Sequence, residues 1–138
     1  MNQKRIISWS LAISLLGFGI GYVLTNSTIF NLCLHDQYAC RALLNRIGDP
    51  LFYGMGALAI VFLVLLFIPR AFSVWKKFAI WFVPLAALLF IFYPDPGSGD
   101  LFSPYPEQVF QWVSGLYVFI SLVLIIYKSF FSSRSEQS

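Results

Sequence analysis

The chain has 138 residues, of which 59% are hydrophobic and only 11% charged, and its formal net charge is +3. Soluble domains carry about a quarter charged residues, so the composition excludes an ordinary soluble enzyme and indicates a single-domain membrane protein. The few basic residues are spread over the segments outside the apolar stretches rather than gathered in one basic cluster. The sequence therefore indicates the lipid bilayer as a partner and no nucleic acid.

Four apolar segments contain no Lys, Arg, Asp, Glu or His: residues 6–24, 51–68, 78–93 and 109–127. About 20 apolar residues of helix cross the hydrocarbon core of a bilayer. The third segment reaches this length only if its helix begins near Val74, with Trp75, Lys76 and Lys77 in the interface. We therefore predict an all-α fold, an integral membrane four-helix bundle running up-down-up-down. Its expected spans are residues 6–24, 51–68, 75–93 and 109–127.

The orientation follows from the basic residues that flank these spans. Two of the nine, Arg41 and Arg46, fall on one side of the membrane and seven on the other: Lys4, Arg5, Arg70, Lys76, Lys77, Lys128 and Arg134. Because basic residues concentrate on the cytoplasmic side, both termini are expected there. We predict a multi-pass protein of the plasma membrane, which is the inner membrane in a bacterium. The outer loops are then residues 25–50 and 94–108, the cytoplasmic loop 69–77 and the cytoplasmic tail 128–138.

The first span carries small residues on one helical face. Ser10, Ser14, Gly17 and Gly21 follow one another at spacings of four, three and four, and the two glycines form a GxxxG pair. Such a face lets another helix approach closely, so we predict helix packing there, within the bundle or alternatively between copies. The basic start of the chain also fits a cleaved signal peptide. However, 19 apolar residues exceed the usual length of about 7–15, which favours a retained span.

Both cysteines of the chain, Cys33 and Cys40, lie in the first outer loop. Cysteine pairs on the oxidising side of a plasma membrane normally form disulfides. In one continuous helix the two residues would be about 10.5 Å apart along the axis, whereas a disulfide needs Cα atoms about 4.4–6.8 Å apart. We therefore predict a disulfide in which Cys33 precedes the helix that contains Cys40.

A short amphipathic helix is expected in the same loop. Asp36 is a candidate N-cap for a helix over residues 37–47, and Gly48 is a candidate C-terminal stop. Asp49 and Pro50 then form the N-cap and first position of the second span. The sequence thus predicts a break between the loop helix and that span.

Two other interpretations of the loop remain open. Cys33, His35, Asp36 and Cys40 are competent zinc ligands, although their spacing is not that of a familiar zinc site, and we expect no metal. In layout the chain resembles the DsbB-type quinone-dependent membrane oxidoreductases, which have four spans and a cysteine pair in the first outer loop. That resemblance implies thiol–disulfide exchange at Cys33 and Cys40. Members of that family have a C-x-x-C pair in the first outer loop and a second cysteine pair in the second outer loop. This chain departs from that pattern, because six residues separate Cys33 and Cys40 and residues 94–108 contain no cysteine.

The functional expectation rests on the chemistry of the spans. Ionisable residues in a membrane mark ion paths and proton relays, and the four apolar segments contain none. We identify no catalytic residue and expect no cofactor. The sequence favours a non-enzymatic accessory or scaffold subunit that contacts other membrane proteins or its own copies. The alternatives are the thiol oxidoreductase and an oligomeric pore or small-solute carrier.

Overall fold

The structure is a computed structural model, and it describes residues 2–34, 36–92 and 106–135. These residues form four long helices and no strand: α1 (Gln3–Thr25), α2 (Tyr38–Phe67), α3 (Phe72–Phe92) and α4 (Pro106–Ser135), with the 3-10 turn η1 (Pro69–Ala71) between α2 and α3. All four are long and apolar enough to span a membrane, so the prediction of an all-α, multi-pass membrane protein is confirmed. Most of the predicted outer loop 94–108 lies outside the described residues.

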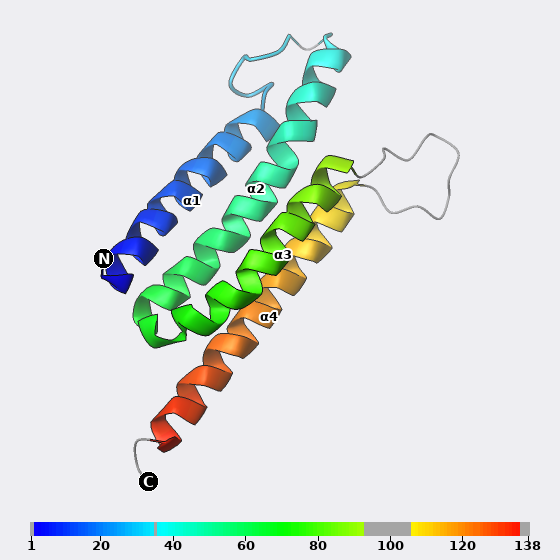
Figure 1. Cartoon of the computed structure of the whole chain (residues 1–138). Helices are drawn as coiled ribbons and strands as arrows, with labels where there is room; N and C mark the ends of the chain where they lie inside the picture. The colour runs from blue at the N-terminus through cyan, green and yellow to red at the C-terminus, as the bar shows by residue number, and fades with distance from the viewer. Residues whose placement is uncertain (1, 35, 93–105, 136–138) are drawn as a thin grey trace.

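The helices pack as two antiparallel hairpins. α1 lies along α2 and α3 along α4, and the hairpins meet where α2 packs on α4 (Figure 1). The spatial order is therefore α1, α2, α4, α3. We call the end of the molecule with η1 the turn end, and the end where α1 leads into α2 the disulfide end.

The buried core lies toward the turn end. Phe62 of α2 packs edge-on against Trp75 of α3, with ring centroids 5.0 Å apart. The indole nitrogen of Trp75 donates a hydrogen bond of 3.2 Å to the buried hydroxyl of Ser121 on α4. Because this bond and ring pair join α2, α3 and α4, the hairpins are held together most firmly near the turn.

The contact between α1 and α2 is close enough to reach the backbone. A Cβ added at Gly21 would lie 2.5 Å from the backbone nitrogen of Phe52, and one at Gly17 would lie 2.7 Å from Cγ of Met55. Ser14 is buried on the same face, and its hydroxyl donates to the carbonyl of Ser10 at 2.8 Å. The small residues of α1 therefore face α2 of the same chain.

The prediction of a separate amphipathic helix over residues 37–47 is wrong, because α2 runs without a break from Tyr38 through Pro50. Gly48 does not stop the helix. A Cβ there would lie 2.9 Å from the backbone nitrogen of Thr25, so the glycine lets α2 pass α1. Asp49 lies inside the helix and accepts a 3.1 Å hydrogen bond from the Thr25 hydroxyl. Asp36 is not the N-cap either: Gln37 is, and its side chain makes no capping bond.

With 30 residues, α2 is longer than the hydrocarbon core of a bilayer requires. Counting about 20 residues back from Phe67 at the turn end reaches Gly48, which lies beside Thr25 at the end of α1. The ten residues before Gly48 then extend α2 by about 15 Å past this boundary. The segment joining α1 to α2 is thus displayed beyond the apolar part of the bundle.

Candidate functional site

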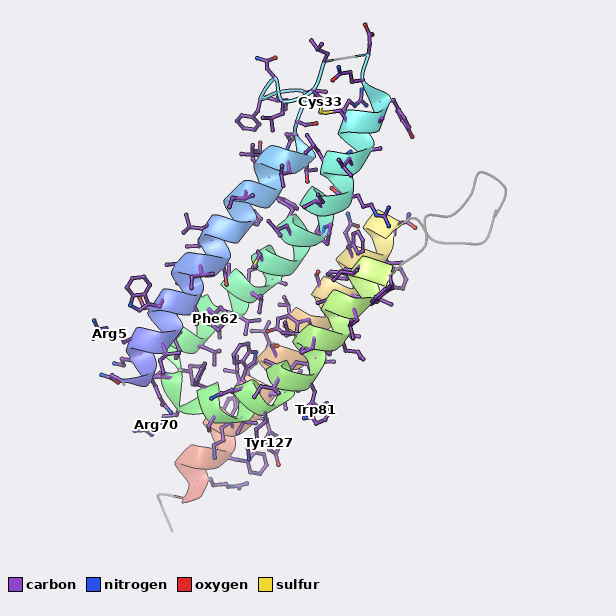
Figure 2. All side chains as sticks on the ribbon, turned by 45° about the horizontal axis from the view of Figure 1, so that its top comes forward. Arg5, Cys33, Phe62, Arg70, Trp81 and Tyr127 are labelled. Atoms are coloured by element: carbon purple, nitrogen blue, oxygen red, sulfur yellow. A yellow bond between two sulfur atoms is a disulfide. The ribbon has the colours of Figure 1, made fainter. Side chains whose placement is uncertain are left out.

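The first candidate site is the disulfide loop, which we define as residues 26–40. Cys33 and Cys40 are joined by a disulfide with their Cα atoms 6.0 Å apart, as predicted. Cys33 precedes α2 and Cys40 lies in its first turn. Figure 2 shows Cys33 at the opposite end of the bundle from Arg5 and Arg70. The bond therefore fastens the loop to the projecting end of α2.

The backbone of the loop is also held by local hydrogen bonds. The amide of Asn26 donates to the carbonyl of Tyr22 at 3.0 Å, which continues the pattern of α1 by one residue. The amide of Leu32 donates to the carbonyl of Ser27 at 2.9 Å. Asn31 adopts a positive φ of 55°, a conformation that asparagine tolerates better than most residues. These features fold the chain back before Cys33.

Apolar side chains project from this loop. Ile29 is 70% exposed, Leu34 71% and Tyr38 80%, while Cys33 at the centre of the loop is only 6% exposed. The cysteines and charges of the segment, from which the loop was predicted, do not indicate this surface. A signal was present in the apolar run from Ile29 to Leu34, in which Asn31 is the one polar residue. An exposed cluster of this kind, beyond the apolar helices, is typical of an interaction surface.

The redox and metal interpretations gain little from this geometry. Both cysteines are in the disulfide, and burial of Cys33 restricts access of an attacking thiolate to its sulfur. Within the described ranges no group of three or more His, Cys, Asp or Glu residues could hold a metal ion. His35, a candidate ligand in the sequence, lies outside those ranges.

The second candidate site is a groove between the two hairpins, with a volume of about 620 Å³. Leu43, Ile47, Leu51 and Gly54 of α2 line one wall, and Val83, Ala87 and Phe90 of α3 line the other. Its floor is α4, through Val113, Ser114 and Tyr117. The groove exists because α2 and α3 both pack on α4 rather than along each other. Sequence reasoning did not predict it, because no local pattern encodes the angle between two hairpins.

Polar groups occur at both ends of the groove. Arg46 lines its disulfide end and is exposed. At the inner end, the buried hydroxyls of Ser114 and Tyr117 lack a hydrogen bond of regular geometry, although Tyr117 faces Ser121 and Trp75. Beside the groove, the Gln111 amide donates to the Tyr53 hydroxyl at 2.8 Å and joins α4 to α2. The walls between these polar ends are apolar.

The predicted packing residues belong to neither site. Ser10, Ser14, Gly17 and Gly21 lie on α1, whereas the groove is lined by α2, α3 and α4. Contact of both glycines with α2 leaves little of this face for a second copy of the chain. Comparison with known proteins adds no further assignment: no family model, curated protein or solved structure matches this chain.

Proposed function

We propose that this protein is a non-enzymatic accessory subunit of a membrane assembly, and that it contacts a partner protein through the disulfide loop. The observation that carries the proposal is the exposure of Ile29, Leu34 and Tyr38 on a loop fastened covalently to α2. Water-exposed apolar clusters on a folded chain are unfavourable unless another surface covers them. Association buries such side chains and recovers their hydrophobic free energy.

Preorganisation of the loop supports the same function. A flexible loop loses conformational entropy when it binds, whereas a cross-linked loop has already lost part of it. The disulfide between Cys33 and Cys40 and the hydrogen bond from the Leu32 amide to the Ser27 carbonyl both restrict this loop before any partner arrives. A rigid apolar surface is suited to stable contact with one partner.

The orientation that accompanies this function places the disulfide loop outside the plasma membrane and both termini in the cytoplasm. It is supported by the excess of basic residues at the turn end, including Arg5 and Arg70 (Figure 2). An oxidising exterior would also maintain the disulfide. Reporter domains that fluoresce only in the cytoplasm, fused to either terminus, should be active. A reporter inserted after Asn31 should be inactive.

The interaction itself is tested by photo-crosslinking in native membranes. A photoreactive phenylalanine analogue is placed at Leu34 or, as a control, at Trp81, which points away from the bundle on α3 (Figure 2). We expect one protein adduct of defined mass from position 34, and its loss when Ile29→Asp and Tyr38→Asp are added. The control position should give lipid adducts instead.

Adducts to lipid alone at position 34 would contradict the proposal, because they would mean that the loop rests in the headgroup region. An adduct of twice the mass of the chain would identify the bound protein as a second copy of this chain. The thiol oxidoreductase alternative predicts a different result: a mixed disulfide with a soluble protein that accumulates when Cys33 or Cys40 is changed to serine.

A further inference from the structure

The groove between the hairpins opens sideways between α2 and α3, at the depth of the hydrocarbon core. Its volume of about 620 Å³ lies within the range of about 300–1,000 Å³ that small-molecule sites have. The side chains lining an empty groove of this size would lose van der Waals contacts. Because the groove is lined mainly by apolar side chains, an apolar molecule of the bilayer is the occupant that would restore these contacts.

The length and depth of the groove match one leaflet. Along α2 it runs from Leu43 to Leu58, which at 1.5 Å per residue is about 22 Å. Half of a bilayer core is about 15 Å thick, and the headgroups lie beyond it. Because the core boundary on α2 falls near Gly48, the groove begins among the headgroups and ends near the middle of the bilayer.

The charge of the groove selects among lipids. Arg46 is the only charged residue among the described residues that line it, and it lies two residues beyond the core boundary. A guanidinium at this depth is placed to bind a phosphate through paired N–H donors. We propose that the groove holds one acyl chain of an anionic phospholipid from the leaflet on the disulfide side, with its headgroup on Arg46.

The hydroxyls of Ser114 and Tyr117 define the competing occupant. They lie at the inner end of the groove, one and two helical turns beyond Gln111, which is level with Tyr53. A ligand with a polar group at this depth would bind there without needing Arg46. The acyl chain is favoured because one lipid accounts for both the length of the groove and the position of its single charge. The two occupants respond to different substitutions.

The test is native mass spectrometry of the full-length protein, released from micelles that contain phosphatidylglycerol or phosphatidylcholine with identical acyl chains. We expect one retained phosphatidylglycerol per chain and roughly fivefold weaker retention of phosphatidylcholine, the effect of one basic residue at an anionic headgroup. Arg46→Gln should remove the preference for phosphatidylglycerol while leaving the binding of the acyl chain intact.

Two glycines provide matched variants for the groove itself. A Cβ at Gly54 would lie 3.8 Å from Cε2 of Phe90 across the groove, whereas one at Gly115 would meet nothing within 4 Å. Gly54→Leu should therefore fill the groove and reduce retention of both lipids, and Gly115→Leu should not. If Gly54→Leu does not fold, as judged by circular dichroism, Ala87→Leu fills the groove from the opposite wall.

Three results would overturn the proposal. Equal retention of the two lipids by the unmodified protein would show that Arg46 selects no headgroup. Equal losses in Gly54→Leu and Gly115→Leu would show that the lipids surround the protein without a site. A retained molecule that is lost in Ser114→Ala and insensitive to Arg46→Gln would identify a ligand held at the inner end.

Discussion

The second half of α1 contains Gly17, Gly19 and Gly21, which make different contacts. Alanine substitutions at the three positions should therefore change the stability of the protein by different amounts. In Gly21→Ala the new Cβ would lie 2.5 Å from the backbone nitrogen and 2.8 Å from Cα of Phe52. Ordinary carbon contacts are about 3.5–4.0 Å, so α1 and α2 must separate by about 1 Å. In Gly19→Ala the Cβ meets nothing within 4 Å.

The magnitudes follow from these contacts. Overpacking against a backbone costs about 1–3 kcal/mol, and alanine recovers about 0.5–1 kcal/mol over glycine within a helix. We expect Gly21→Ala to lower the free energy of unfolding by about 1–2 kcal/mol on this balance, and Gly19→Ala to leave it unchanged or raise it slightly. Gly17→Ala should fall between them, because its Cβ would meet the flexible side chain of Met55, with Cγ at 2.7 Å.

The assay is unfolding in mixed micelles by increasing mole fractions of sodium dodecyl sulfate, followed by tryptophan fluorescence of the four native tryptophans. Gly19→Ala serves as the control, since it makes the same chemical change two residues away on the lipid-facing side. Equal stability of Gly21→Ala and Gly19→Ala would refute the close approach of α1 to α2.

Three further predictions concern the disulfide and the polar contacts between helices. Changing both Cys33 and Cys40 to serine opens an eight-residue ring, so the free energy of unfolding should fall by about 2.5 kcal/mol in the chain-entropy model. Protease cleavage within residues 26–37 should also become faster. Unchanged cleavage would contradict the restriction of the loop by the disulfide. Ser121→Ala leaves the buried indole N–H of Trp75 without its acceptor and should lower the free energy of unfolding by about 0.5–2 kcal/mol. Ser129→Ala, at an exposed position of α4, is the control. Equal effects of the two substitutions would exclude the hydrogen bond as the cause. Gln111→Leu removes an exposed hydrogen bond to Tyr53 and should cost less than about 1 kcal/mol in the same unfolding assay. A loss larger than that of Ser121→Ala would mean that this exposed bond joins the hairpins more strongly than the buried bond of Trp75 does.

Much of the fold follows from local properties that the sequence displays. The apolar segments predict the four spans because a bilayer requires a fixed length of apolar helix. The place of Cys33 before the helix that contains Cys40 follows from their spacing together with the rise of a helix per residue. In each case the physical requirement involves residues close to one another in the chain.

What could not be predicted depends on contacts between distant segments. Gly48 has the properties of a helix stop, but its position beside Thr25 makes it a point of close approach inside α2. Pro50 likewise fits a helix start, yet α2 continues through it. The groove depends on the packing of α2 and α3 on α4. Arg46 and Ser114, which are far apart in the sequence, therefore line the same groove only in the folded chain.

The position of the core has a consequence for how this protein can change in evolution. Residues that hold the hairpins together, such as Phe62, Trp75 and Ser121, lie toward the turn end. The disulfide loop and the opening of the groove lie at the other end. Substitutions in the proposed interaction surface and groove can therefore accumulate without touching the residues that secure the fold. The molecule separates its scaffold from its adaptable surface along a single axis.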